Sequence, residues 1–230
     1  MKQQTGDWTW LHQQLLAHWG AQHWWPAETS FEVMVGAILT QNTAWTNVEK
    51  AIARLRAAEL LSVPAILASG EMELETCLHP SGYYRVKTRR LRALCAFLRE
   101  EGCADLPESL RDKGTIPELR AKLLRVHGVG EETADSILLY ALHLPIMVVD
   151  AYTKRIATRL GWIADNVKYA SLQRAIESTL SPGDVAARNE LHALLVELGK
   201  GTCRPRRPLC RQCPLVEGCD FGRTQECPGN

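Results

Sequence analysis

Apolar residues recur along this chain at the spacing of three to four positions that marks the buried face of an amphipathic helix. The clearest stretches are residues 31–39, 48–55, 91–98, 119–124, 137–142, 156–160 and 191–198. No stretch alternates apolar and polar residues in the way that a half-buried strand does. Proline and glycine breaks, for example Pro80-Ser81-Gly82 and Pro182-Gly183, separate about ten helical segments. The sequence therefore predicts an all-α protein.

The composition is that of a globular protein with enough apolar material for a large core. Hydrophobic residues make up 46% and charged residues 23% of the 230 residues, which fits one large domain or two compact lobes. No run approaches the roughly 20 apolar residues that cross a bilayer. Residues 1–7 also lack the basic-then-apolar order of a secretory signal. We therefore expect a cytoplasmic protein with no membrane partner.

Basic residues are distributed unevenly, although the net charge is only +1. They gather near residues 85–92, 120–125 and 200–211, and the last group includes Arg204. Such clusters can follow a phosphate backbone even when acidic surface elsewhere cancels their charge. Each cluster taken alone is explained equally well as the solvated face of a helix.

Four of the eight cysteines crowd into a short segment near the C-terminal end: Cys203, Cys210, Cys213 and Cys219. In an intracellular chain, eight cysteines argue against a disulfide framework. Four thiolates in one loop can instead wrap a metal centre. The spacing by itself leaves both zinc and an iron–sulfur cluster open.

Residues 124–134 predict a helix, a tight Gly128-Val129-Gly130 turn and a second helix. Two glycines at this spacing permit positive φ angles and expose backbone amides at the start of the second helix. Together with the positive end of the helix dipole, these amides form a site for an anion such as a phosphate. A Gly-x-Gly between two helices is also often only a corner, and the turn alone does not decide between the two.

Asp150 follows an apolar run and precedes a predicted helix, eighteen residues after Glu132. The simplest role for an aspartate in this position is to cap the helix that follows. The same residue can also start the helix with its backbone while its carboxylate oxygens face a cleft.

The hairpin, Val149-Asp150 and the order of the separated motifs resemble the helix-hairpin-helix DNA glycosylases of the endonuclease III superfamily. The resemblance runs from about Trp24 to Cys219, which is most of the chain. It implies that Asp150 is the catalytic carboxylate, which stabilises an oxocarbenium-like sugar as the base departs or orients the attacking water. It also implies that the four cysteines hold a [4Fe-4S] cluster, whose loop presents Arg204 to phosphates.

One departure from the bifunctional members of this family concerns the second hairpin helix. In those enzymes a lysine there forms a Schiff base and then nicks the strand. The matching residue of this chain is Glu132, which has no amine. We therefore expect a monofunctional enzyme that leaves an abasic site, with weak or absent AP-lyase activity.

Tryptophans near the N-terminus bear on the choice of base. Such residues are usually core or linker packing, yet a glycosylase must stack the base that it turns out of the duplex. Indole faces suit the positively charged ring of an alkylated purine. The Trp-Trp-Pro segment, the Thr-Gln-Asn-Thr segment before Trp45, the run from Pro80 to Tyr84 and Glu132 resemble the type III 3-methyladenine DNA glycosylase branch.

This resemblance assigns the remaining site residues. The base pocket would be lined by Trp24, Trp25, Pro26, Trp45, Glu132 and Tyr152. The residues expected to contact DNA are Gln41 and Asn42, near the gap left in the duplex, with Gly128, Val129, Gly130, Thr133 and Arg204.

The resemblance implies two helical lobes with the DNA and active-site cleft between them. Residues 29–144 would form a helical barrel with the hairpin, and residues 1–28 plus 145–230 the iron–sulfur cluster lobe. We expect a monomeric, nucleoid-associated base excision repair enzyme of a bacterium or archaeon, acting on double-stranded DNA that contains a damaged, 3-methyladenine-like base. The alternatives are an endonuclease III-like pyrimidine or mismatch glycosylase and a non-catalytic DNA-binding protein. A pure binder gains nothing from a carboxylate beside DNA, so Asp150 favours catalysis.

Overall fold

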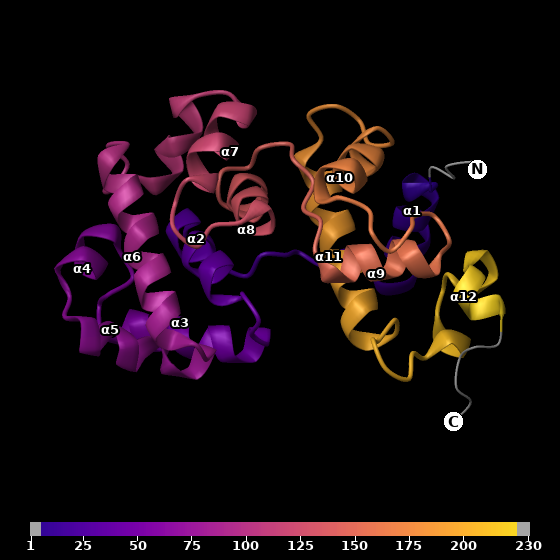
Figure 1. The fold of residues 1–230 in the computed structure, drawn as a ribbon, viewed down its shortest axis with the longest axis horizontal. Coiled ribbons are helices and arrows are strands. Elements are labelled where there is room, and N and C mark those ends of the chain that lie inside the picture. The colour runs from indigo at the N-terminus through magenta and orange to yellow at the C-terminus, as the bar shows by residue number, and fades with distance from the viewer. Residues whose placement is uncertain (1–5, 225–230) are drawn as a thin grey trace. The chain divides into compact units, whose positions relative to one another are not determined.

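The computed structural model describes residues 6–224, and within that range it contains helices and loops but no strand (Figure 1). This confirms the all-α prediction. The chain divides into two compact units, which we describe separately: unit 1 holds the described parts of residues 1–24 and 145–230, and unit 2 holds residues 25–144. Unit 2 thus begins at Trp25, whereas the sequence placed the start of the barrel at residue 29. No helix in the described part of the chain is long and apolar enough to span a membrane.

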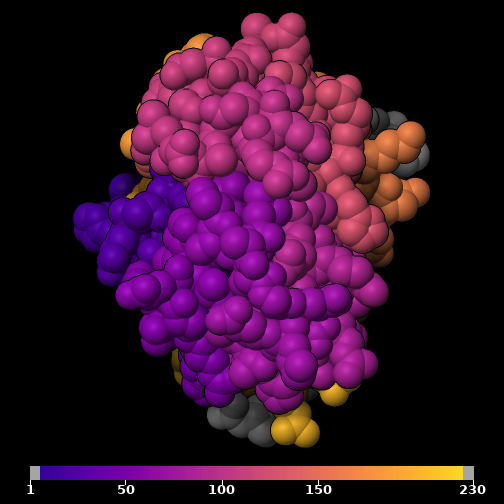
Figure 2. Space-filling view, turned by 90° about the vertical axis from the view of Figure 1, so that its left-hand side faces the viewer, coloured from indigo at the N-terminus to yellow at the C-terminus, as the bar shows by residue number. Residues whose placement is uncertain are grey.

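Unit 2 is a bundle of short helices, and its surface is the purple and magenta part of Figure 2. Its α-helices are α2 (Ser30–Leu39), α3 (Trp45–Ala57), α4 (Val63–Ala68), α5 (Glu71–Leu78), α6 (Tyr84–Glu100), α7 (Ile116–Leu124) and α8 (Glu131–Ser136). Two 3-10 turns, η1 (His79–Ser81) and η2 (Pro107–Lys113), and one wide π turn, η3 (Ile137–Ala141), complete it.

Helix α2 lies at the centre of unit 2 because it is apolar on every side. Every residue from Phe31 to Leu39 is buried, which is the pattern of a helix surrounded by others. Its start is fixed by Thr29, whose hydroxyl accepts a hydrogen bond from the amide of Glu32 at 3.1 Å. The buried helix ends where the sequence becomes polar, so Thr40 is half-buried and Asn42 is exposed.

Unit 1 is built around α9 and α11, with α1 packed against α11. Its helices are α1 (Trp8–Trp19), α9 (Ala151–Arg159), α10 (Tyr169–Glu177), α11 (Val185–Gly201) and α12 (Asp220–Arg223), with short 3-10 turns η4 (Cys210–Gln212) and η5 (Val216–Gly218). Gly199 lets α9 and α11 approach closely, because a Cβ there would lie 2.3 Å from Tyr152. This contact fixes the position of the helix that Asp150 begins.

Candidate active site and nucleic-acid interface

The helix-hairpin-helix motif forms as predicted in outline, with α7 and α8 joined by residues 125–130. Gly128 has a φ of 84°, and a Cβ there would lie 2.2 Å from Cγ of Arg90. Gly130 has a φ of −97°, so only Gly128 adopts the positive φ that both glycines permit. Only the first glycine makes the turn, because α8 begins directly from extended backbone at the second.

Two other hairpin residues in the predicted DNA-contact set make their hydrogen bonds within the protein. The amide of Val129 donates to the carbonyl of Val126 at 3.0 Å, and its side chain is buried. Thr133 is also buried, and its hydroxyl accepts a hydrogen bond from Gln41. The exposed residues of the turn are Arg125, His127 and Gly130, followed by the first two residues of α8.

Gln41 braces this hairpin from the loop that follows α2. Its Nε2 donates to the carbonyl of Gly128 and to the hydroxyl of Thr133, each at 3.0 Å. Its Oε1 accepts a hydrogen bond from Arg90, the residue that packs beneath Gly128. The Gln41 amide thus ties residues 40–43 to the hairpin through Nε2 and to α6 through Oε1. The neighbouring Asn42 is exposed.

The basic cluster of residues 85–92 is not the continuous phosphate-binding strip that its sequence permits. Lys87 is 1% exposed and bonds three oxygens of the protein. Burial, with a smaller effect of the nearby Arg90 guanidinium, lowers the pKa of Lys87 to about 8. Only side chains such as Arg85 and Arg89 remain exposed in this segment.

Asp150 caps α9 and keeps a second oxygen for other contacts. Its Oδ1 accepts hydrogen bonds from the amide of Thr153 at 2.7 Å and from the hydroxyl of Thr153 at 2.8 Å. Its Oδ2 lies 3.7 Å from Nε2 of His192 on α11. No pattern in the sequence selects His192, because a histidine within an apolar helix carries no motif of its own.

The predicted base-pocket residues are distributed over both units. Trp24 and Tyr152 belong to unit 1, and Trp25, Pro26, Trp45 and Glu132 belong to unit 2. Trp25 sits edge-to-face with Trp45 and with Tyr140, at ring-centroid distances of 5.3 Å in both cases. Gly36 makes room for it, since a Cβ there would lie 2.8 Å from the indole. Glu132 is exposed in the first turn of α8.

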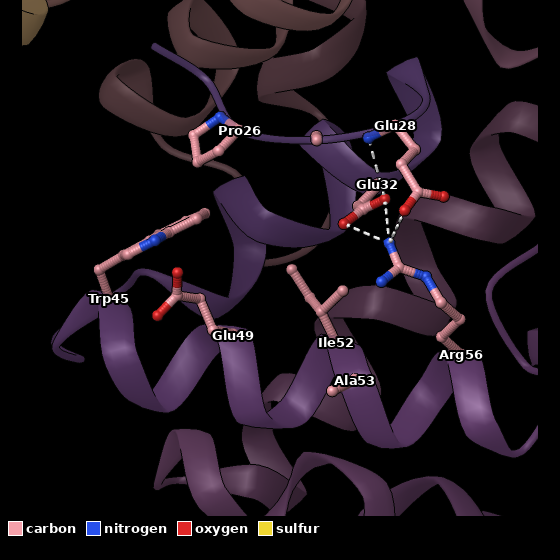
Figure 3. A pocket seen from close by; sticks show the side chains of 9 residues that line it. Pro26, Glu28, Glu32, Trp45, Glu49, Ile52, Ala53 and Arg56 are labelled. Atoms are coloured by element: carbon pink, nitrogen blue, oxygen red, sulfur yellow. Dashed lines mark hydrogen bonds and ion pairs between the residues drawn. The ribbon is translucent and has the colours of Figure 1, made fainter. Parts of the chain in front are cut away.

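A cavity of about 380 Å³ opens between α3 and the segment 26–28 (Figure 3). Pro26 and Trp45 stand at one end, and Arg56 stands at the other, paired with Glu32 at 2.9 Å and Glu28 at 3.3 Å. Glu49 projects into the space beside Trp45 (Figure 3) and makes no ion pair or hydrogen bond with the described residues. The cavity therefore combines an aromatic wall with a carboxylate that is not neutralised by a neighbour.

The four clustered cysteines line one small pocket in unit 1, together with Arg159 and Phe221. Nη1 of Arg159 lies 3.2 Å from Sγ of Cys203, and the guanidinium also holds the carbonyls of Arg204 and Pro205. Burial raises the pKa of Cys213 to about 11, as expected for a thiol that no cation stabilises as thiolate. Among the described residues, no three Cys, His, Asp or Glu side chains are placed to hold a single metal ion. Cys203, Cys213 and Cys219 carry free thiols, whereas Cys210 is disulfide-bonded in this structure. With Cys210 reduced, four sulfur donors around one pocket are chemically suited to a larger group.

Residues 35–182 match the HhH-GPD superfamily of base excision DNA repair proteins. The chain belongs to this superfamily. It is therefore a base excision DNA glycosylase, and the predicted endonuclease III superfamily is confirmed.

Relatives and solved structures agree along most of the chain. A Methanocaldococcus jannaschii protein named as a DNA repair glycosylase is 46% identical over 91% of this chain and 94% of its own length. Endonuclease III of Thermotoga maritima is 31% identical over 84% of each chain. The 3-methyladenine DNA glycosylase of H. pylori bound to 1,N6-ethenoadenine superposes with a TM-score of 0.73, with 29% identity over 85% of this chain and 98% of that one. An endonuclease III–DNA complex superposes with a TM-score of 0.80 and 21% identity, over 97% of this chain and 98% of that one, which shows the shared fold.

Proposed function

We propose that this glycosylase is monofunctional, excises alkylated and positively charged purines such as 3-methyladenine from duplex DNA, and leaves an abasic site. The observation that carries the substrate class is the cavity shared by Pro26, Trp45 and Glu49. Its volume of about 380 Å³ lies within the range of small-molecule sites. An indole face and a carboxylate together attract a cationic ring more strongly than a neutral one.

The proposed catalytic group is Asp150. Its Oδ1 is occupied by the Thr153 hydrogen bonds, which hold the carboxylate in one orientation. Its negative charge stabilises the positive charge that develops on the sugar when the glycosidic bond lengthens. A cationic purine leaves readily because its departure neutralises it, so a single oriented carboxylate suffices.

Strand cleavage is not part of the proposed reaction. In bifunctional members of the superfamily, a lysine in the second hairpin helix forms the Schiff base. Glu132 occupies that position here, and a carboxylate cannot form a Schiff base. The expected product is an intact strand with an abasic site.

The proposed partner is double-stranded DNA, bound by a monomer through the hairpin and the loop that Gln41 ties to it. Solved structures of this fold include an endonuclease III–DNA complex. Asn42, Gly130 and Arg204 are the exposed members of the predicted contact set. Phosphate contacts dominate such binding, so affinity is expected to fall steeply with salt.

We also propose that Cys203, Cys213 and Cys219, with Cys210 in its reduced form, hold a [4Fe-4S] cluster, supported by the pocket that the four cysteines share. When bound, the cluster would supply a fixed fold for the loop rather than a redox step in base removal. Arg159 would then donate to a cluster ligand through its contact with Cys203.

A panel of defined lesions in duplex DNA tests the function, with each product scored before and after alkali. We expect release of 3-methyladenine, and strand nicks only after alkali.

Glu49→Gln, which keeps the shape of the side chain, tests the charge of the cavity. It should slow release of cationic 3-methyladenine roughly tenfold or more and leave release of neutral 1,N6-ethenoadenine and hypoxanthine nearly unchanged. Equally slowed release of all three bases would show that the charge of Glu49 does not select cationic bases. Excision confined to oxidised pyrimidines would establish the endonuclease III-like alternative instead.

A further inference from the structure

A single buried ammonium ties together three segments at one end of unit 2. Nζ of Lys87 on α6 donates to the carbonyl of Leu39 at 2.8 Å, to the carbonyl of Ser81 at 2.7 Å and to the hydroxyl of Thr43 at 2.5 Å. These three acceptors use all the donors of an ammonium group. The side chain is only 1% exposed, and the protein supplies a hydrogen-bond acceptor for each N–H of the ammonium without solvent.

The two loops held by Lys87 each contain a strained residue. Asn42 has a φ of 54° and Tyr83 a φ of 47°, values in the left-handed region that non-glycine residues seldom adopt. The loops also bond each other directly, because the hydroxyl of Thr43 donates to the carbonyl of Ser81 at 2.5 Å. Neither strained residue packs in the core, since Asn42 is exposed and Tyr83 is 74% exposed.

Strain that persists at exposed residues has to be held by their surroundings, and it concentrates at functional surfaces. Here the loop of Asn42 is also the loop that Gln41 bonds to the hairpin at Gly128. Hydrogen bonds thus connect residues 40–43, residues 79–83 and the hairpin in one continuous network, with Lys87 and Arg90 of α6 beneath it.

We propose that Lys87 is a positioning residue, which pre-organises the loops of Asn42 and Tyr83 for contact with the duplex. The proposal rests on the proposed DNA glycosylase function. Lys87 itself does not touch DNA, because it is buried under the two loops. When binding requires an ordered loop, the apparent affinity is the intrinsic affinity multiplied by the fraction of molecules in which the loop is already ordered. Removal of the ammonium should therefore weaken DNA binding through disorder of both loops.

Two variants test this without depending on one substitution. Lys87→Met keeps an unbranched side chain that is one atom shorter and removes the charge. Thr43→Val keeps the shape of the side chain and removes the hydroxyl. Thr43→Ser retains the hydroxyl and is the matched rescue. Cys95→Ala, at a buried residue further along the same helix, controls for general loss of stability in α6.

Amide hydrogen exchange of the free protein is measured first. Lys87→Met and Thr43→Val should speed exchange in residues 40–43 and 79–83 at least several-fold, while Thr43→Ser and Cys95→Ala resemble the wild type there. Affinity for duplex DNA containing an abasic-site analogue should then fall roughly tenfold for the first pair alone. At saturating enzyme, the single-turnover excision rate should change less than the affinity.

Unchanged exchange in both loops, or unchanged affinity with faster exchange, would overturn the role assigned to Lys87. Failure of the wild type to release any damaged base would overturn the proposed function instead. The exchange measurement separates these outcomes, because it requires neither DNA nor activity.

Discussion

Oδ2 of Asp150 lies 3.7 Å from Nε2 of His192, and the two residues are 7% and 6% exposed. This distance is too long for a hydrogen bond, and the contact becomes an ion pair only when His192 is protonated. Burial lowers the pKa of His192, and the opposing effect of the Asp150 carboxylate is smaller. The proposed catalytic carboxylate therefore faces a neutral imidazole at neutral pH.

The lowered pKa of His192 predicts a loss of stability in mild acid. Below about pH 6.5 the unfolded chain protonates this histidine while the folded protein resists, so unfolding takes up a proton and stability falls as the pH drops. Above that pH the residue contributes no pH dependence. His192→Gln should therefore flatten the fall in urea-unfolding free energy between pH 7.5 and 5.5. The exposed His18→Gln is the control, and parallel slopes for wild type and His192→Gln would contradict the prediction.

Asp150→Asn should abolish excision without unfolding the protein. Asparagine caps a helix as well as aspartate does, so the hydrogen bonds to Thr153 remain possible. The loss of charge should lower single-turnover excision by about 10² or more, and DNA binding should be equal or tighter because one negative charge is removed. Asp184→Asn, at the N-cap of α11, is the matched control and should excise normally. Retained excision by Asp150→Asn would remove the carboxylate from the mechanism.

Gly128→Ala and Gly130→Ala should differ sharply in stability. At Gly128 an added Cβ meets Arg90 at 2.2 Å and the φ is 84°, so a cost of at least 1–2 kcal/mol is expected, at roughly the scale of left-handed strain. At Gly130 the added Cβ meets nothing within 4 Å, and the melting temperature should stay nearly the same. A weaker DNA affinity of Gly130→Ala with unchanged stability would indicate close approach of a phosphate to that backbone. Equal destabilisation by both changes would contradict the different roles of the two glycines.

Glu132→Lys should introduce strand-nicking chemistry that the wild type lacks. The substitution supplies an amine at the exposed second residue of α8, at a cost of roughly 0.3–1 kcal/mol for a cation at a helix N-terminus. Borohydride should trap a covalent adduct of the variant with abasic DNA, and Glu132→Gln should give none. Efficient trapping of the wild-type protein would refute the monofunctional assignment.

Iron analysis tests the proposed cluster. Protein purified without metal addition should be yellow-brown and contain about four iron atoms per chain. Cys213→Ser should lose the iron and destabilise the loop, whereas Cys77→Ser, a buried cysteine of unit 2, should retain it. Stoichiometric zinc in a colourless protein would establish the zinc alternative that the cysteine spacing leaves open.

The sequence by itself determined the helical class, the hairpin, the helix that begins at Asp150 and the superfamily. These are local properties, since apolar period, capping residues and turn glycines act over a few neighbouring positions. The glutamate at position 132 and the four cysteines are likewise visible without any fold. Glu49 and His192 stand in ordinary helical surroundings, so nothing in their neighbours along the chain distinguishes them.

Only the tertiary structure decided which charged side chains form hydrogen bonds within the protein and which remain exposed. Lys87 and Arg90 look like their neighbours Arg85 and Arg89 in the sequence, yet one pair braces loops and the other remains exposed. It also showed that Gln41 holds the hairpin and that His192 faces Asp150 across 3.7 Å. These relationships join residues tens of positions apart, and packing of helices, rather than any local pattern, brings them within contact distance.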